Sequence, residues 1–155
     1  CLAPSAMNRQ PWRFSVVANR PAIRRLSDES KKNLLAELEA NPASPLDRYG
    51  DLLRNPAFNV FYDAPCVVYV CGPREMKSVQ ADCALAVSYF MLAAAARGLG
   101  TCWVALGADV RDPALLAQLG ITPELRIVAP VTLGYPESVP EPPARSEPVI
   151  LGFLR

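Results

Sequence analysis

The sequence predicts an α+β fold in which helices cover both faces of a mixed β-sheet. Residues 64–71 form an unbroken apolar run, the pattern of a strand that is covered on both of its faces. Residues 78–99 are apolar almost all round, which is typical of a helix buried in a core or at a subunit interface. Strand and helix patterns alternate irregularly along the chain, so we expect helices on both sides of one sheet.

Three further segments lie before residue 60. The short β-branched run "FSVVA" at residues 14–18 predicts a strand. Residues 27–40 predict an amphipathic helix, because Ser27 can cap the first turn, acidic residues follow, and three leucines form one apolar stripe. Residues 41–59 are rich in proline, aspartate, arginine and asparagine, and we expect a mobile excursion there.

The second half of the chain continues the alternation. Residues 101–106 predict another strand or extended segment, and residues 125–135 predict the last strand. Between them, a short helix begins at Pro113 and ends at Gly120. Six of the nineteen residues from 130 to 148 are proline, so an extended, stiff segment leads to the apolar ending "PVILGFLR". We expect that ending to dock on this subunit or on another one.

The composition predicts one globular domain covering residues 1–155. Hydrophobic residues make up 51% and charged residues 20% of the 155 residues. The net charge of +1 gives no reason to expect nucleic acid or an acidic membrane surface as a partner. The most apolar stretch, "CALAVSYFMLAAAA", is shorter than the about 20 residues that a membrane span needs.

The histidine and cysteine content excludes several classes of catalytic and metal-binding site. Histidine is absent, which excludes Ser-His-Asp and Cys-His nucleophiles, histidine-containing zinc sites and histidine-bound haem. The cysteines are Cys1, Cys66, Cys71, Cys83 and Cys102. They form no C-x-x-C pair, so we expect no metal and no dithiol, but buried, reduced thiols in a cytoplasmic protein. Cys102 is a weaker candidate for a redox thiol, since no neighbouring cysteine or base activates it.

Three segments carry polar groups that can bind a ligand. In "PSAMNRQPW", the amides of Asn8 and Gln10 offer paired donors and acceptors that suit a planar heterocycle or a polyol. In "RGLGTCWVALG", the glycines let backbone N–H groups approach a ligand closely. Arg145 ends a stiff polyproline stretch and suits a phosphate. Each segment alone also has an ordinary structural interpretation: a capped turn with a core tryptophan, a helix end and a surface arginine.

Taken in order, four segments resemble the nitroreductase family of flavin enzymes. "PSAMNRQPWRF" is similar to that family's P-S-x-x-N-x-Q-P-W-x-F motif, and "FYDAP" with the strand after it resembles the second landmark. "DCALAVSYFMLAAAARGLGTCWV" resembles the long dimer-interface helix and its following turn, and "VAPVTLGYPESVPEPPAR" resembles the "LGYP…R" ending. The resemblance runs from Leu2 to about Pro148. The variants "GLGTCWV" and "PPARSEP" look most like the branch in which a ferredoxin-type iron–sulfur domain is often fused upstream.

The resemblance implies a homodimer that binds one FMN per subunit at the dimer interface, with residues of both chains in each site. The residues that it assigns to FMN are Pro4, Ser5, Ala6, Asn8, Gln10, Trp103, Val104, Ala105, Leu106 and Arg145. The first five would line the flavin ring and ribityl chain from the partner subunit. The backbone of residues 103–106 would run past the hydride-accepting nitrogen, with residues 104–106 as N–H donors, and Arg145 would hold the phosphate.

The sequence departs from the family pattern in the part that binds the FMN phosphate. The family normally begins with a helix carrying an R-x-x-R-type cluster that grips the FMN phosphate, and this sequence lacks it. We therefore expect a single nitroreductase-like domain without that helix. Either an upstream segment precedes Cys1, or Arg145 is the main phosphate anchor.

The implied activity is hydride transfer from NADH or NADPH to FMN, followed by reduction of a small electron-poor acceptor such as a nitroaromatic or a quinone. The flavin carries the chemistry, so no side chain is assigned as a catalytic acid or base. One alternative is a specialised relative, a reductive dehalogenase or a flavin-fragmenting enzyme, with residues 41–59 as the candidate substrate lid. The other is a non-catalytic flavin-binding or electron-transfer module that serves a ferredoxin-type partner.

Overall fold

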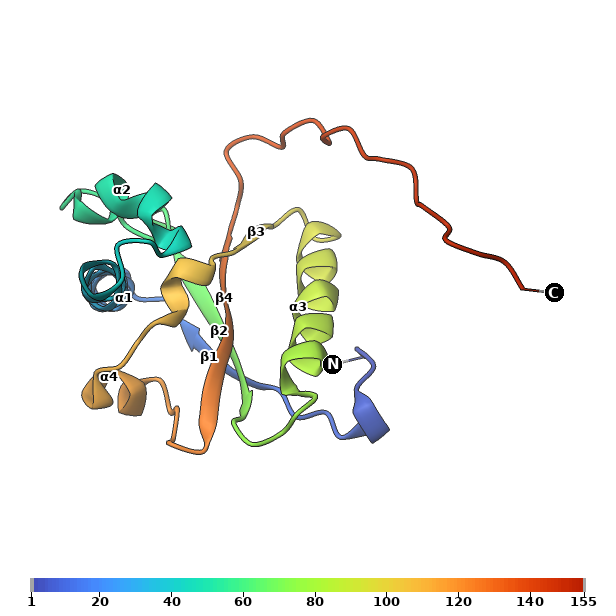
Figure 1. The fold of residues 1–155 in the computed structure, drawn as a ribbon, viewed down its shortest axis with the longest axis horizontal. Helices are drawn as coiled ribbons and strands as arrows, with labels where there is room; N and C mark the ends of the chain where they lie inside the picture. The colour runs from blue at the N-terminus through green and yellow to red at the C-terminus, as the bar shows by residue number, and fades with distance from the viewer. Residues whose placement is uncertain (1, 155) are drawn as a thin grey trace.

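A four-stranded sheet in the order β1-β2-β4-β3 organises the computed structural model, which describes residues 2–154 (Figure 1). The strands are β1 (Arg13–Val17), β2 (Cys66–Pro73), β3 (Gly100–Trp103) and β4 (Leu125–Gly134). All three strand pairings are antiparallel. β2 and β3 point the same way, but β4 lies between them and runs against both. The α+β class is therefore confirmed, with a sheet that is antiparallel, not mixed, within the described residues.

Helices cover both faces of this sheet, as the sequence predicts. Helix α3 (Val79–Ala95) lies on one face (Figure 1). Helix α1 (Arg20–Ala40), helix α4 (Pro113–Gln118) and the 3-10 turn η3 (Ala105–Ala108) lie on the other face. Each face therefore has its own hydrophobic core, and β2 contributes to both of them.

The side chains of β2 show why its sequence has no polar alternation. Val67, Tyr69 and Cys71 belong to the core on the α1 side. Val68 and Val70 belong to the core on the α3 side. All five side chains are buried, so both faces of this central strand need apolar residues.

Helix α1 begins at Arg20, well before Ser27, so the predicted start was wrong. Asn19 is the N-cap, and its Oδ1 accepts a hydrogen bond from the Ala22 amide at 2.9 Å. Pro21 lies in the first turn, where a missing N–H group is tolerated. Ser27 is instead fully buried, and its Oγ accepts a hydrogen bond from the Val60 amide at 3.0 Å.

Residues 41–59 fold into two short helical turns, η2 (Pro45–Tyr49) and α2 (Gly50–Arg54), which replaces the mobile excursion that we expected. Lys31 of α1 fastens the end of this segment. Its buried Nζ donates hydrogen bonds to the carbonyl oxygens of Asn55 at 2.6 Å and Phe58 at 3.0 Å. Neither contact is visible in the sequence, where Lys31 resembles a surface charge.

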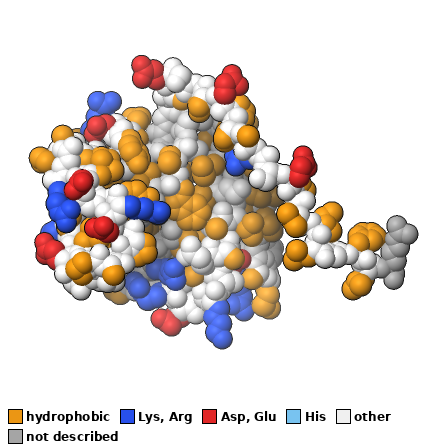
Figure 2. All heavy atoms as spheres, turned by 45° about the horizontal axis from the view of Figure 1, so that its top comes forward, with side chains coloured by type: hydrophobic (Ala, Val, Ile, Leu, Met, Phe, Trp, Pro, Cys, Tyr) orange, Lys and Arg blue, Asp and Glu red, His pale blue; other side chains and the backbone are white. Residues whose placement is uncertain are grey.

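The later helices and strands occur where the sequence predicts them, but some of them end at other residues than predicted. Helix α3 ends at Ala95, and β3 ends at Trp103, where the chain turns into η3. Residues 135–154 contain no helix or strand and lead away from the body as an extended tail whose apolar side chains are visible in Figure 2. Docking of this tail on its own subunit is not observed, since Leu151 is 97% exposed. Within residues 2–154, no helix has the length and apolar character to cross a membrane.

Candidate functional site

The loop before β1 has an unusual backbone. Met7, Asn8 and Gln10 have φ values of 52°, 54° and 47°, in the left-handed region that few non-glycine residues adopt. A non-glycine residue held there costs about 1–3 kcal/mol, and such residues cluster at binding sites. An ordinary turn could place glycine at these positions. The backbone of this loop therefore favours the ligand-binding interpretation of "PSAMNRQPW".

Side chains within the loop fix its shape. The Gln10 amide nitrogen donates a hydrogen bond to Ser5 Oγ at 2.9 Å, and Gln10 Nε2 donates one to Asn8 Oδ1 at 3.0 Å. Asn8 and Gln10 are exposed, whereas Trp12 is buried in the core beneath α3. The expected turn with a core tryptophan is thus present, and it presents two amide side chains to solvent.

Asp82, in the first turn of α3, anchors this loop to the body of the protein. Its Oδ1 accepts a hydrogen bond from the Ala6 amide at 2.8 Å, and its Oδ2 accepts one from Ser78 Oγ at 2.8 Å. The side chain is only 3% exposed, so few waters compete for these bonds. Asp82 was not predicted as part of a site, because in the sequence it is only a lone carboxylate at the start of an otherwise apolar helix.

The second predicted segment, residues 103–106, includes the end of β3. Its backbone N–H groups differ in whether they are already hydrogen-bonded. The Val104 amide donates to the Pro130 carbonyl oxygen at 2.9 Å, which extends the sheet pairing by one bond. Within residues 2–154, no hydrogen bond uses the amide nitrogen of Ala105 or Leu106. Of the three expected backbone donors, the latter two are therefore free for a ligand, and Val104 is not.

A cavity of about 370 Å³ lies beside these free amides. Residues 102–106 form one side of it, and Leu34, Leu46, Arg48, Tyr49 and Tyr62 form the other. The Arg48 guanidinium lies 4.8 Å from the centre of the Tyr49 ring, which orients both side chains through a cation–π contact. Residues 41–59, expected as a lid, thus supply three residues of the cavity wall. Arg48, Tyr49 and Tyr62 were missed because nothing in their sequence marks them as neighbours of residue 105.

Within one chain, the structure does not bring the predicted site residues together. The loop lies on the α3 side of the sheet, where Ala3 and Trp12 join that core, while Val104 joins the core on the α1 side. The loop contacts the first turn of α3, whereas β3 follows the other end of this 17-residue helix, about 25 Å away along its axis. Arg145 is exposed and belongs to the tail, which leads away from the body of the protein (Figure 1).

Gly107 holds the free amides close to the core. A Cβ atom at this position would lie 2.2 Å from Phe61 Cε1, and Phe61 is fully buried. We expect Gly107→Ala to lower the free energy of unfolding by about 1–3 kcal/mol, because the buried ring or the turn must shift. Guanidinium unfolding followed by tryptophan fluorescence measures this loss. A smaller loss in a Phe61→Leu background is expected, and an equal loss in both backgrounds would contradict the proposed clash.

Three of the four described thiols are buried or partly buried, and the fourth, Cys102, is exposed. Burial raises the pKa of Cys71 to about 12 and the pKa of Cys83 to about 11, with smaller contributions from Cys83 and Asp82 respectively. Burial also raises the pKa of Cys66. Cys102 is exposed, and Cys1 lies outside the described residues. No group of three potential metal ligands occurs among residues 2–154.

We expect one fast-reacting thiol in a Cys1→Ser variant at pH 8. At that pH about 0.1% or less of Cys71 and Cys83 is ionised, and the thiolate is the reactive form. Cys102 alone should react quickly with a colorimetric disulfide reagent, and the other three should follow after unfolding. Fast reaction of a second thiol in the native protein would contradict the burial described above.

The fold and these two surfaces define an α+β domain with a strained, amide-rich loop on one face and free backbone donors on the other. A sequence model described as the nitroreductase family matches residues 2–135, and the chain belongs to that family. The family and the α+β fold predicted from the sequence are thereby confirmed.

Three relatives illustrate the range of this similarity. A protein of Archaeoglobus fulgidus named "Putative NADH dehydrogenase/NAD(P)H nitroreductase" is 29% identical over 88% of this chain and 67% of its own length. An iodotyrosine deiodinase of Thermotoga neapolitana is 30% identical over 97% of this chain and 79% of its own length. A crystal structure of oxidized iodotyrosine deiodinase bound to FMN and 3-iodo-L-tyrosine has a TM-score of 0.67 at 28% identity, over 99% of this chain and 82% of that one.

Proposed function

We propose that the protein is an FMN-dependent oxidoreductase that uses NADH or NADPH to reduce an electron-poor acceptor such as a nitroaromatic or a quinone. The observation that carries this proposal is the pair of free amides at Ala105 and Leu106 beside an aromatic-lined cavity. FMN, when bound, supplies a ring that accepts a hydride from the nicotinamide and passes electrons on. Backbone N–H groups that are fixed before the ligand arrives stabilise developing negative charge at little cost in reorganisation.

The residues present fit such a group. Asn8 and Gln10 offer exposed amides for the polar edge of a flavin, and Pro4, Ser5 and Ala6 form the backbone next to them. Trp103 to Leu106 offer the second surface, with Ala105 and Leu106 as the donors. We assign the phosphate to Arg145, together with any arginines of an upstream segment. We assign no side chain as a catalytic acid or base, because the flavin would carry the chemistry.

A homodimer is part of this proposal. The two surfaces lie on opposite faces of one chain, so a second copy is needed to place both beside one flavin. Helix α3 supports this, because Leu85, Tyr89 and Leu92 recur at helical spacing and are 41%, 48% and 68% exposed, a large apolar face for a monomer. The exposed apolar tail is the second element that we assign to the partner.

The dimer has a direct test. Replacing Leu92 with aspartate is expected to convert a dimer into a monomer, because the charge must be desolvated in the interface. Light scattering after gel filtration measures the mass of each. Arg97→Asp, near the exposed end of α3, is a matched control that changes charge without removing an apolar side chain. A wild-type protein that stays monomeric with FMN bound would contradict the dimeric site.

The activity has a test of its own. FMN is added to the purified full-length natural chain, unbound flavin is removed, and the spectrum is recorded before and after NADH or NADPH is added without oxygen. Retained flavin that one nicotinamide bleaches, and that an added quinone or nitroaromatic reoxidises, is the expected result. Flavin that is retained but not bleached favours an electron-transfer module with a ferredoxin-type partner. A colourless protein contradicts every flavin-based proposal.

A second candidate function is reductive dehalogenation. The similarity to two iodotyrosine deiodinases favours it, and so does the cavity with Arg48, Tyr49 and Tyr62 beside the free amides. In this reaction the carbon–iodine bond breaks, iodide leaves, and the ring gains a proton while the reduced flavin supplies two electrons. Iodide release from 3-iodo-L-tyrosine by the dithionite-reduced protein tests it. The buried, reduced thiols support a cytoplasmic location for either activity.

A further inference from the structure

Arg48 is the one charged side chain among the described residues that line the cavity beside the free amides of Ala105 and Leu106. No aspartate or glutamate of residues 2–154 lines this cavity, so Arg48 gives it a positive charge. The cavity volume, about 370 Å³, is within the range of about 300–1,000 Å³ that small-molecule sites occupy. The flavin contacts proposed above do not use this arginine, so its charge is available to a second ligand of the same site.

The guanidinium of Arg48 keeps its hydrogen-bond donors. Within residues 2–154 it forms no hydrogen bond and takes part in none of the ion pairs. Its contact is with the ring of Tyr49, whose centre lies 4.8 Å from the guanidinium carbon. This cation–π contact orients the guanidinium, while its N–H groups remain available. A guanidinium in this state suits a carboxylate, which it can bind through two parallel hydrogen bonds.

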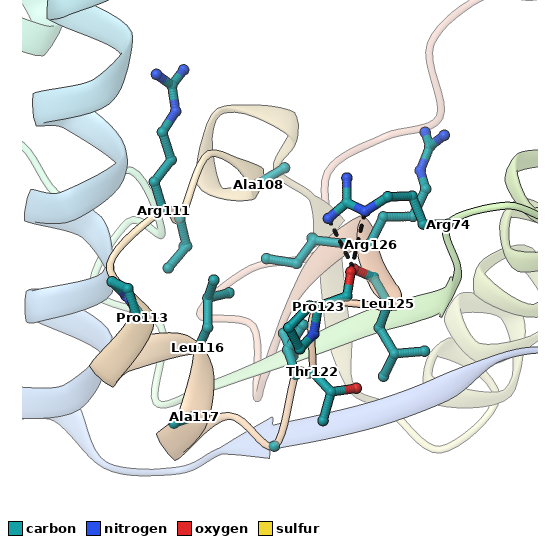
Figure 3. Close-up of a pocket in the computed structure, with 14 residues that line it drawn as sticks. Arg74, Ala108, Arg111, Pro113, Leu116, Ala117, Thr122, Pro123, Leu125 and Arg126 are labelled. Carbon is teal, nitrogen blue, oxygen red and sulfur yellow. Dashed lines mark hydrogen bonds between the residues drawn. The ribbon is translucent and has the colours of Figure 1, made fainter.

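Arg74 illustrates the contrasting arrangement. It lies at a larger cavity, of about 850 Å³, and donates to the carbonyl oxygens of Pro123 at 3.3 Å and Leu125 at 3.1 Å (Figure 3). No phenylalanine, tyrosine or tryptophan of the described chain lines that cavity. The cavity at Arg48 differs in both respects, because its arginine is free of carbonyl partners and Tyr49 and Tyr62 line it. It therefore favours a ligand that is both anionic and aromatic.

Tyr62 projects from a strained turn. Tyr62 and Asp63 have φ values of 53° and 55°, and such residues cost about 1–3 kcal/mol each and cluster at binding sites. Buried Asn59 fixes the turn: its carbonyl oxygen accepts from the Tyr62 amide at 2.8 Å, and its Nδ2 donates to Asp63 Oδ1 at 2.9 Å. Phe58 packs edge-on against the Tyr62 ring, with the ring centres 5.9 Å apart. Tyr62 is nevertheless 64% exposed, so this strained turn holds an open aromatic surface at the cavity.

We propose that the acceptor reduced at this site is an aromatic carboxylate, with its carboxylate at Arg48 and its ring against Tyr62. This inference rests on the proposed function, because it names the class of acceptor for the same site. With a nitrobenzoate, NADH or NADPH supplies a hydride through the flavin, which provides two electrons and one proton, and solvent supplies a second proton. The nitro group loses one oxygen as water and becomes a nitroso group. The carboxylate takes no part in this step and serves only for recognition.

Calorimetric titration of the full-length natural chain, with FMN added and no nicotinamide, tests the recognition. 4-Nitrobenzoate and 4-nitrobenzamide have nearly the same shape and differ in charge. We expect the benzoate to bind about tenfold more tightly at low ionic strength, and the difference to shrink in high salt because Arg48 is exposed. Equal affinity for the two compounds, or no binding of the benzoate, overturns the proposal.

Reduction of the same two compounds separates this proposal from the proposed function. We expect a higher kcat/KM for 4-nitrobenzoate, mainly through a lower KM. Reduction of both compounds with equal kcat/KM supports the proposed function and overturns the selection for an anion. Reduction of neither contradicts the proposed function, and the calorimetric preference, which needs no electron donor, then decides the anion site by itself.

Two arginines of the same segment give a matched pair of variants. Arg54 is exposed like Arg48, but it pairs with Asp51 at 3.8 Å and does not line the cavity. We expect Arg48→Met to weaken binding of 4-nitrobenzoate about tenfold and to leave 4-nitrobenzamide unchanged, and Arg54→Met to change neither. Arg48→Lys keeps the charge without the two-pronged geometry, so an intermediate loss is expected. Equal losses in Arg48→Met and Arg54→Met, or a tenfold loss of FMN affinity in Arg48→Met, overturn the proposal.

The aromatic half of the site has its own pair of variants. We expect Tyr62→Leu to weaken binding of both nitro compounds about threefold, because it removes the ring surface, and Tyr62→Phe to keep their affinity. The same calorimetric titrations measure these changes. Unchanged affinity in Tyr62→Leu would show that the ring of the ligand lies elsewhere, which overturns the proposed placement.

Discussion

Replacing Asp82 with alanine is expected to weaken FMN binding about tenfold or more and to lower the free energy of unfolding by about 1–3 kcal/mol. The carboxylate is buried and holds the Ala6 amide at 2.8 Å. Without it, that amide loses its acceptor, and among residues 2–154 no other hydrogen bond joins residues 5–10 to α3. The loop can then relax to unstrained backbone angles that no longer present its amides together.

Two measurements separate a positioning role from general instability. Fluorescence quenching during FMN titration gives the affinity, and the rate of tryptic cleavage after the exposed Arg9 reports the mobility of the loop. Asp82→Asn keeps an acceptor for Ala6 and is expected to retain most of the affinity, while Ser78→Ala removes only the second contact. Wild-type FMN affinity and unchanged cleavage in Asp82→Ala would contradict the anchoring role. The cleavage rate remains informative if the wild-type protein binds no flavin.

The parts of the fold that the sequence predicts well are those in which burial is a local pattern. β2 is apolar on both faces because both faces are covered, and α3 is apolar nearly all round because its outer face also carries large hydrophobic residues. Such patterns can be read without knowing what packs on them. Helix α1 shows the limit of this approach. Its first turns depend on a cap at Asn19 and a tolerated proline, and they precede the apolar stripe that revealed the helix.

The candidate site could be predicted in part for a similar reason. The loop and residues 103–106 carry contiguous motifs, so the sequence identifies them, although it cannot say that they lie on opposite faces of one chain. The Val104 amide is occupied only because β3 pairs with β4. Asp82 meets Ala6 across 76 positions of sequence, and Arg48 reaches the cavity only through the folding of η2. Contacts of this kind depend on topology, which no local pattern encodes.

A buried carboxylate holds the other side of the site. Glu29 of α1 is 8% exposed, and its Oε1 accepts hydrogen bonds from Asn33 Nδ2 at 2.9 Å and from the amides of Asp112 at 3.1 Å and Arg111 at 3.4 Å. Its Oε2 pairs with Lys32 at 2.7 Å. Asn33 Nδ2 also donates to the Asp109 carbonyl oxygen at 2.8 Å. These bonds tie the segment after η3 to α1.

Glu29→Ala is therefore expected to lower the free energy of unfolding at pH 7 by about 3 kcal/mol, because it leaves partly buried amides without an acceptor. Glu29→Gln keeps one acceptor oxygen and is expected to cost about 1 kcal/mol. Glu39→Gln, on the exposed face of α1, is the matched control and should change little. Urea unfolding of the three variants measures these differences. Equal losses for Glu29→Ala and Glu39→Gln would contradict a structural role for the carboxylate.

The same carboxylate predicts a pH dependence with a definite sign. Burial alone would raise the pKa of Glu29, but hydrogen bonds from Lys32, Asn33 and the Arg111 amide outweigh burial, so the pKa lies below its usual value of 4.5. Because the folded pKa is the lower one, the stabilisation is fully present well above pH 4.5 and is lost as the pH falls through the folded pKa. The free energy of unfolding of the wild type should thus fall more between pH 7 and pH 3 than that of Glu29→Gln. Equal falls in the two proteins would show that Glu29 has the same pKa in the folded and unfolded states, which would contradict the prediction.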